Sequence, residues 1–462
     1  MKILLATDGY THTTNGVANV VIALADKYRA EGHSVKVLTL SDSRKSYQKG
    51  EDYFISSFSI LIYPDTRQSV VRRHPFLKEI IEWRPDIIHI HTEGSVAGMS
   101  RYISKKTDAP IVMTMHTDWA KFAFHDHSEA AFVKFLGSLG SKLVYRDARL
   151  MTVPSPKAQD LLKGYLPKRK IVVIPNGIKL ERFQQPLTQE ERAELLAQYG
   201  LKDNGKLLVI VSRISAEKRL DEILEFFPRL RQADPEVQLL IAGDGPDKKN
   251  LEHLAEKLGI TDSVIFAGMV PPEKVYRIYK LGTVFLSAST FEMHSLTYLE
   301  AIACGIPLIC RNDPCLRGVL DDGVNGFTYE TQDEFTKKVL KVIQNPALRQ
   351  QMSDAALQKS LEFSDTACAH RMIEMYGEVI EEAAKEREEE EKAAKEADKA
   401  AKEAEKAEKK AEKEAEKAEK AEKKAEKEAG KAEKKAEKKA EKAEKKAEKE
   451  AEKAEKKEKR DK

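Results

Sequence analysis

The chain has 462 residues and a formal net charge of +3, from 79 basic and 76 acidic residues. Residues 383–462 hold 30 basic and 27 acidic residues, so residues 1–382 hold 49 of each sign and are formally neutral. A neutral globular part argues against a nucleic-acid-binding protein, whose domain would be basic. No apolar run reaches 18 residues and the one at the N-terminus is short, so we expect neither a membrane-spanning helix nor a signal peptide.

The first part of the chain alternates apolar, strand-like segments with helical ones. Residues 2–7 read as a buried strand, and a polar loop leads from it to a helix over residues 17–31 that ends at Gly32. Strands separated by helices in this way predict βαβ units and a parallel sheet. The other strands of this set are expected at residues 35–40, 87–91, 111–115, 150–153 and 171–174.

Two loops of this first set carry candidate ligand groups. Gly16, in the first strand-to-helix loop, would let a backbone approach a phosphate closely, although a plain turn is the commoner role of a lone glycine. His116 ends the strand at 111–115 and would face the same cleft as Gly16, at the carboxyl ends of the strands. A lone histidine, however, is more often structural. The other histidines of this part show no metal-ligand spacing, so we expect no metal site.

A second alternating set follows the polar residues 176–204. About 380 residues exceed what one hydrophobic core holds, so the two sets predict two doubly wound domains with a cleft between them. Residues 363–382 then read as one more amphipathic helix, with four large side chains along one side. The strands of the second set are expected at residues 206–212, 237–242, 264–267, 283–287 and 307–310.

The loop after the strand at 206–212 carries two cations. Arg213 offers a planar fork that suits phosphate oxygens, and Lys218 adds a point charge. The alternative is that both side chains are ordinary solvated charges. The next such loop, Gly243-Asp244-Gly245, lacks the third glycine of a dinucleotide fingerprint and is weak evidence for NAD.

Residues 289–301 join the strand at 283–287 to a helix expected over 296–304. Ser295 is expected to cap this helix, with its hydroxyl accepting one of the first free backbone N–H groups. Ligands bind at the carboxyl ends of strands in open α/β sheets, and a helix start favours an anion such as a diphosphate. Glu292 in the loop and Glu300 in the helix can each accept sugar or ribose hydroxyls, unless they are simply solvated.

The run Glu292-x7-Glu300, followed by Ala-Ile-Ala-Cys-Gly-Ile-Pro at 301–307, resembles the donor-site motif of retaining GT-B glycosyltransferases of family 4. The continuation over 311–327 looks like the branch that glucosylates 1,2-diacylglycerol. The resemblance covers roughly residues 1–382. It departs from the family at Met293 and Ser295, which stand where small glycines are usual.

The resemblance implies a GT-B fold, with two Rossmann-like domains facing a cleft. Residues 1–184 would form the acceptor domain and residues 185–362 the nucleotide-sugar domain. Residues 363–382 would cross back to the first domain, and residues 383–462 would form a low-complexity tail, either helical or disordered.

The resemblance also assigns roles to single residues. Glu292, His116, Arg213 and Lys218 would form the catalytic set, with His116 against the donor sugar and the two cations on the diphosphate. Asp118 is our candidate for orienting the acceptor hydroxyl. The donor would further contact Asn15, Gly16, Val270, Ser295, Leu296, Thr297 and Glu300, of which Glu300 would hold the ribose.

We therefore expect a retaining hexosyltransferase that moves glucose from UDP-glucose to a lipid acceptor, 1,2-diacylglycerol, in glycolipid synthesis. The donor set would replace a metal, and we expect no cofactor. Three alternatives remain open. They are the same chemistry on a glycan or polyprenyl-linked acceptor, a nucleotide-sugar epimerase on the same fold, and a non-catalytic binding module in which the tail is the working part.

Basic clusters within residues 72–170 and phenylalanines between Trp119 and Tyr145 predict an apolar surface flanked by cations, suited to an anionic membrane. The alternative is a buried helix with solvated lysines. Four cysteines without metal spacing suit reduced thiols, so we expect a cytoplasmic protein held peripherally on the inner face of the cell membrane. In the tail, alanines recur every three or four residues, which predicts a solvated helix rather than a tight coiled coil.

Overall fold

The structure is a computed structural model that describes residues 1–9, 16–60, 63–71, 73–116 and 144–459. The chain divides into two compact units, residues 1–382 and residues 383–462. None of the helices in the described ranges combines the length and the apolar character needed to cross a bilayer.

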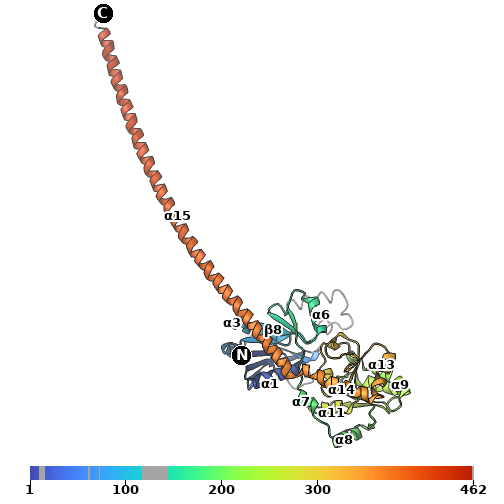
Figure 1. Ribbon diagram of the computed structural model, residues 1–462. Coiled ribbons are helices and arrows are strands. Elements are labelled where there is room, and N and C mark those ends of the chain that lie inside the picture. The colour runs from blue at the N-terminus through green and yellow to red at the C-terminus, as the bar shows by residue number, and fades with distance from the viewer. Residues whose placement is uncertain (10–15, 61–62, 72, 117–143, 460–462) are drawn as a thin grey trace. The chain divides into compact units, whose positions relative to one another are not determined.

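The first half of unit 1–382 is organised by an eight-stranded sheet of order β10-β9-β8-β7-β1-β2-β4-β3. Figure 1 draws this half of the unit in blue to green. Its neighbours pair in parallel, apart from the antiparallel edge pair β3 and β4. The strands are β1 (Lys2–Thr7), β2 (Ser34–Leu40), β3 (Tyr47–Lys49), β4 (Asp52–Ile55), β7 (Ile87–Ile90), β8 (Ile111–Thr114), β9 (Leu150–Val153) and β10 (Ile171–Val173), and the helices are α1 (Gly16–Ala30), α2 (Pro75–Trp83), α3 (Ser95–Thr107) and α6 (Pro156–Tyr165).

Strand β1 shows why helices cover both faces of this sheet. Its side chains alternate, so Ile3 and Leu5 join a buried cluster with α1, whereas Leu4 and Ala6 join another with α3. A parallel strand that is buried on both faces is apolar along its length. This is the reason that the run at residues 2–7 predicts a strand correctly.

A six-stranded parallel sheet of order β13-β12-β11-β14-β15-β16 organises the second half. Helices again lie on both of its faces. The strands are β11 (Leu207–Val211), β12 (Gln238–Ala242), β13 (Val264–Gly268), β14 (Val284–Ser287), β15 (Leu308–Arg311) and β16 (Gly326–Tyr329), and the helices are α7 (Leu180–Gln184), α8 (Gln189–Tyr199), α9 (Leu220–Ala233), α10 (Lys248–Lys257), α11 (Val275–Leu281), α12 (Leu296–Ala303), α13 (Gln332–Ile343) and α14 (Pro346–Ser360).

The two doubly wound sheets confirm the expected fold class. Every strand expected from the sequence is present, and no end moves by more than one residue. The prediction missed β3, β4, β16 and the hairpin of β5 (Phe58–Ile60) and β6 (Tyr63–Gln68). Polar residues interrupt or flank these short segments, so they show neither the apolar run nor the alternation that marks the strands that were predicted. Strand β16 also begins at Gly326, where a Cβ would lie 2.1 Å from the carbonyl oxygen of Leu308, so only glycine fits.

Helix α15 (Asp365–Glu458) begins within unit 1–382. Its side chains Met372, Met375, Tyr376 and Val379 are buried in the same cluster as Ile3 and α1, so this amphipathic face packs against the first sheet. Ile178, Leu180 and Phe183, which precede the boundary expected at residue 184, are buried with the core of the second sheet.

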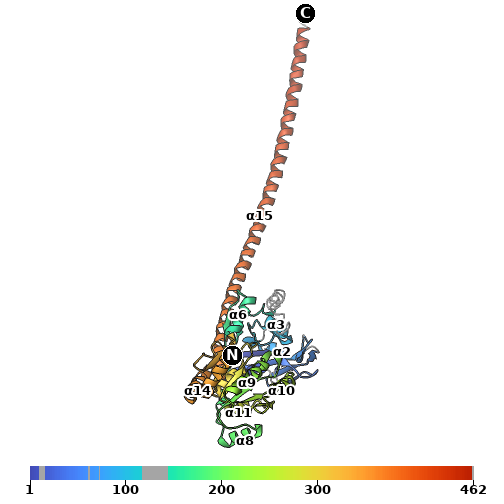
Figure 2. The same ribbon diagram turned by 90° about the vertical axis from the view of Figure 1, so that its right-hand side faces the viewer.

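Within unit 383–462, helix α15 continues to Glu458 (Figure 2). From Ala384 to Lys457 every residue is exposed, so this helix has no buried core of its own. Its support comes from good helix formers and from Glu–Lys pairs one turn apart, such as Glu405 with Lys409 at 2.5 Å. The exposed helix agrees with the expectation of a solvated helical tail.

Candidate active site

The order of the second sheet places two predicted loops side by side. Strands β11 and β14 are parallel neighbours at the point where the strand order reverses direction, and such a point is where open α/β sheets bind ligands. The loop after β11 carries Arg213 and Lys218, and the loop after β14 carries Glu292. Parallel neighbours end at the same edge of a sheet, so residues far apart in the chain meet there.

Lys218 and Glu292 contact each other directly at this edge. Lys218 ends the short 3₁₀ turn Ala216–Lys218, and its Nζ donates to Oε1 of Glu292. Ser289 Oγ donates to the same oxygen at 3.2 Å. Both charged side chains are only about one-fifth exposed, at 20% and 18%, so water screens the pair less than it screens a surface pair. Arg213 lies exposed in the same loop as Lys218.

The start of helix α12 differs from the expectation in one respect. Ser295 is the N-cap residue, but its Oγ pairs with Oγ1 of Thr297 at 2.9 Å and makes no capping bond to the backbone. The prediction that its hydroxyl accepts a backbone N–H is therefore wrong, because a second hydroxyl within reach competes for it. The first N–H groups of α12 thus lack the expected side-chain partner at Ser295, which keeps them suited to an anion.

Glu300 lies one turn into α12 and is largely buried. Tyr279 of α11 donates its phenolic O–H to Glu300 Oε2 at 2.7 Å. Burial raises the pKa of Glu300 to about 7, against the opposing effects of the Tyr279 bond and the Arg182 charge. One carboxylate oxygen is held by Tyr279, so a ribose would meet mainly the other.

The first helix of the chain lies against α12. A Cβ added to Gly16, the first residue of α1, would lie 3.6 Å from Cδ1 of Leu296, the first residue of α12. Leu296 packs against the buried clusters of both sheets. The structure therefore brings together Gly16 and Leu296, which the sequence predicts as donor contacts from different domains.

His116 follows β8 and belongs to a buried group of histidines. Its Nε2 lies 3.1 Å from Nδ1 of His91, and the two rings are stacked at 5.4 Å. Burial lowers the pKa of His116 to about 4, and burial together with His116 lowers the pKa of His294 to about 4. Both are neutral near pH 7. Burial also lowers the pKa of His91 well below its usual value, so in the His91–His116 contact one neutral ring donates and the other accepts. His294 belongs to the Glu292 loop, whose Met293 is buried in the same cluster as Met113 of β8.

Asp8, in the loop after β1, makes hydrogen bonds that hold the fold together. Its carboxylate accepts from Thr92 Oγ1 at 2.6 Å and from the backbone N–H groups of Gly94 and Val96 at 3.0 and 3.1 Å. These bonds tie the end of β1 to the start of α3. Asp8 therefore joins two strand ends of the first sheet at its own reversal point, between β1 and β7.

Several predicted residues lie apart from these contacts or outside the described residues. Val270 follows β13 and is half-buried against the core of the second sheet. Asn15, Asp118 and the segment 117–143, with its predicted apolar membrane surface, fall outside the part of the chain that the structure describes. Within the described part, no group of three or more His, Cys, Asp or Glu side chains is arranged to hold a metal ion.

Sequence reasoning missed two residues in the first half of the molecule that hydrogen-bond to the Glu292 loop. They are Ser155 and Lys157, at the start of α6, which bond to the loop and to Asp313. A Ser-Pro-Lys start signals only a helix N-terminus. Residues 157 and 313 are far apart in the chain and share no recognisable spacing, so the sequence could not predict that they contact each other.

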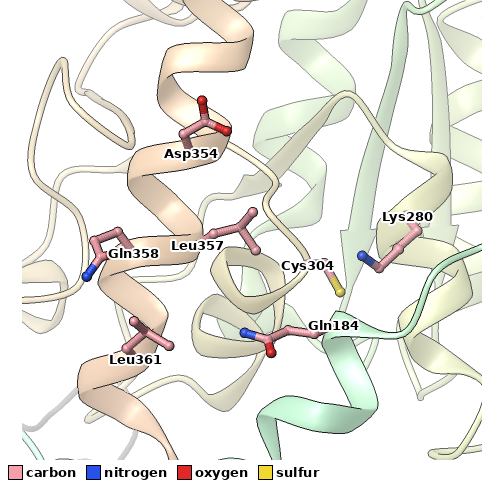
Figure 3. A pocket seen from close by; sticks show the side chains of 7 residues that line it. All are labelled: Gln184, Lys280, Cys304, Asp354, Leu357, Gln358 and Leu361. Atoms are coloured by element: carbon pink, nitrogen blue, oxygen red, sulfur yellow. The ribbon is translucent and has the colours of Figure 1, made fainter.

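A separate hollow of about 450 Å³ opens beside the C-terminal end of α12 (Figure 3). Figure 3 shows Cys304 and Lys280 close to each other, across the hollow from side chains of α14. Burial raises the pKa of the Cys304 thiol, which keeps it protonated at neutral pH. None of the predicted site residues lines this hollow, so it is distinct from the Lys218–Glu292 region. Its lining residues are Gln184, Lys280, Cys304, Asp354, Leu357, Gln358 and Leu361.

Comparisons with known proteins show similarity to glycosyltransferases. The family model described as glycosyl transferases group 1 matches residues 191–359, and that of glycosyltransferase family 4 matches residues 14–182. An alpha-monoglucosyldiacylglycerol synthase of Streptococcus pneumoniae is 33% identical over 350 residues, which are 74% of this chain and 78% of that protein. The synthase of the same name from Acholeplasma laidlawii is 26% identical over 397 residues, 84% of this chain and 99% of that protein.

Solved structures share the fold. The Anabaena protein Alr3699/HepE, in complex with UDP, superposes with a TM-score of 0.64 at 17% identity, over 82% of this chain and 100% of that one. Sucrose-phosphate synthase from Thermosynechococcus elongatus superposes with a TM-score of 0.65 at 17% identity, over 82% and 98% of the two chains.

Proposed function

The chain belongs to family 4 of the GT-B glycosyltransferases, and from this premise we propose that it transfers glucose from UDP-glucose to a diacylglycerol with retention at the anomeric carbon. The second sheet and its loops would hold the donor, and the first sheet would present the acceptor. The observation that carries the proposal is the contact between Lys218 and Glu292 at the reversal point of the second sheet, beside the start of α12.

This contact combines the two kinds of group that a sugar nucleotide requires. When the bond between the anomeric carbon and the diphosphate breaks, negative charge grows on the leaving oxygen. We propose that Lys218, Arg213 and the N–H groups at the start of α12 would stabilise that charge without a metal ion, since such preorganised charge is often the largest catalytic contribution. Glu292 would accept hydroxyl groups of the sugar, while Glu300 would accept those of the ribose.

His116 would face the sugar from the first sheet. Its lowered pKa keeps the imidazole neutral, so it offers one donor and one acceptor and adds no positive charge beside the anomeric carbon. The neighbouring His294, in the Glu292 loop, is neutral for the same reason. From the side of the first sheet, His116 would hold the sugar against Glu292 and keep water from the reacting bond.

The lipid acceptor is supported by the relatives rather than by the described geometry. Two of them, at 33% and 26% identity, are named for making alpha-monoglucosyldiacylglycerol. A third, from Streptococcus pneumoniae and 27% identical over 354 residues, is named as an alpha-galactosylglucosyldiacylglycerol synthase, so the sugar has to be tested together with the acceptor. Because diacylglycerol stays in the bilayer, we also propose that the enzyme works as a peripheral protein on an anionic cytoplasmic membrane surface.

The test is an incubation of the full chain with a panel of UDP-sugars, with and without diacylglycerol in detergent micelles. Mass spectrometry should find a monoglucosyl lipid only when UDP-glucose and diacylglycerol are both present. A new sugar nucleotide formed without acceptor would instead identify an epimerase. Transfer to a polyprenyl phosphate or a glycan, but not to diacylglycerol, would keep the chemistry and overturn the acceptor.

A further inference from the structure

The Glu292 loop is held from the first sheet by the start of α6. Ser155 caps that helix by accepting from the N–H of Ala158 at 3.2 Å. Its hydroxyl hydrogen remains available, and Ser155 Oγ donates it to the carbonyl oxygen of Met293 at 2.5 Å. Ser155 is 1% exposed, so this bond is shielded from water. Breaking a buried hydrogen bond of this kind costs stability, because the polar group that remains has no water to replace its partner.

Lys157, two residues further on, uses all three of its donors on the second half of the molecule. Its Nζ lies 2.8 Å from the carbonyl oxygen of Thr290 and 2.7 and 2.8 Å from the two carboxylate oxygens of Asp313. The side chains of Lys157 and Asp313 are 16% and 8% exposed. Asp313 also accepts from the N–H of Cys315 at 2.8 Å, which fixes its orientation.

Met293 adds an apolar anchor at the same place. Its side chain is 9% exposed and is buried in the core cluster of the first sheet, together with Met113, Met151 and Val153. Glu292 therefore stands between two fixed backbone points, the carbonyl of Thr290 and that of Met293. Both points are held by the part of the chain that carries His116.

We infer that the first turn of α6 positions the catalytic loop, with Lys157 and Ser155 as positioning residues that set where Glu292 lies relative to His116. This inference rests on the proposed function in assigning Glu292 to the sugar. The physical reason is that a loop held at two points loses little further freedom on reaching the reactive geometry, whereas a free loop must be ordered at each turnover. Displacements near 1 Å cost about 100-fold in rate.

The chain contains a matched control for this contact. Arg317 and Asp160 also join the second half of the molecule to α6, with Arg317 Nη1 2.9 Å from Asp160 Oδ2. Their side chains are 56% and 59% exposed, and exposed ion pairs of this kind contribute little. Arg317→Met therefore removes one ion pair to the same helix without touching the Glu292 loop.

The experiment compares Lys157→Met, Lys157→Arg and Arg317→Met in the full chain by steady-state kinetics, UDP calorimetry and thermal melting. We expect Lys157→Met to lower kcat about 10- to 100-fold, with the Kd for UDP changed less than about threefold. Lys157→Arg should recover part of kcat, and Arg317→Met should match the parent. A Lys157→Met enzyme with parental kcat, or one whose loss in kcat is matched by its loss in UDP affinity, would overturn the positioning role.

A second variant covers the case in which Lys157→Met leaves Asp313 buried without its partner and the fold is lost. Lys157→Met combined with Asp313→Asn removes both charges and keeps an acceptor for the Cys315 N–H. Hydrogen exchange of amides 289–295 in the absence of substrate then reads loop order without any reference to glucose transfer. Faster exchange in the double variant, but not in Arg317→Met, supports the grip even if glucosyl transfer itself is not found, whereas unchanged exchange contradicts it.

Discussion

Lysine–carboxylate pairs occur both at the candidate site and along the tail, yet they differ in what they do. Lys218–Glu292 and Lys157–Asp313 are between 8% and 20% exposed and join segments far apart in the chain. Lys402–Asp398 in the tail is 68% and 64% exposed and joins neighbouring turns of one helix. Burial makes the first kind specific and costly to break, and solvent makes the second kind weak and replaceable.

The largest effect is expected at Lys218. Lys218→Ala should raise the barrier by roughly 2–4 kcal/mol, or lower kcat about 30- to 1000-fold, because the ammonium stabilises charge that appears on the leaving diphosphate. Steady-state kinetics and a melting curve test this.

The control for that prediction is Lys338→Ala. Lys338 pairs with Glu334 within α13 at 3.4 Å, in the same half of the molecule but away from both loops. Lys338 also donates to the carbonyl oxygen of Thr328 at 2.6 Å. Its removal should leave kcat within about twofold, since neither contact involves the loops that carry Lys218 and Glu292. Equal losses in the two variants would show a general effect of lysine removal and would take Lys218 out of the site.

Glu300 provides an intermediate effect that depends on pH. Its pKa rises on folding from 4.5 to about 7, so between these values the folded protein binds more protons than the unfolded chain. Its contribution to stability is therefore present below about pH 4.5 and is lost as the pH rises to about 7, by roughly 1–3 kcal/mol. Glu300→Gln should lose less unfolding free energy than the parent between pH 5 and pH 8 in denaturant titrations. The same slope in both proteins would contradict a raised pKa at this position.

Removing residues 383–462 should have almost no effect on the folded unit. That segment is exposed throughout its described length beyond Ala383, which is itself 6% exposed and marks where burial stops. We expect kcat on micelle-dispersed acceptor within about twofold of the full chain and a Tm within about 2 °C, since loss of solvated helix costs a core little. A truncated protein that does not fold would place the boundary of the unit further along α15.

The smallest effect is expected from chelation. If Lys218, Arg213 and the start of α12 supply the positive charge that the leaving diphosphate needs, glucosyl transfer should be unchanged in EDTA. The measurement is the initial rate before and after dialysis against EDTA, with added Mg²⁺ or Mn²⁺ as the comparison. Activity that is lost and then restored only by a divalent ion would show that the protein cations do not suffice.

The sequence by itself determined the two doubly wound sheets and which loops lie at the carboxyl edges of their strands. The reason is local: apolar runs bounded by turns define strands, and residues that follow a strand lie at the carboxyl edge of a parallel sheet. Arg213, Lys218, Glu292 and Glu300 could be named on that ground together with the resemblance. Strands β3 and β16 could not be named, because they lack the run of apolar residues that marks equally short strands such as β9 and β10.

Only the tertiary structure decided how those loops are held and what their groups meet. Ser295 has the sequence of a capping residue, but its hydroxyl hydrogen-bonds to the hydroxyl of Thr297 instead of to a backbone N–H. Lys157 has the sequence of a surface lysine, yet the fold brings it against Thr290 and Asp313. Such partners are chosen by which sheet edges and helix ends come together, and a side chain more than a hundred positions away leaves no periodic mark at residue 157 itself.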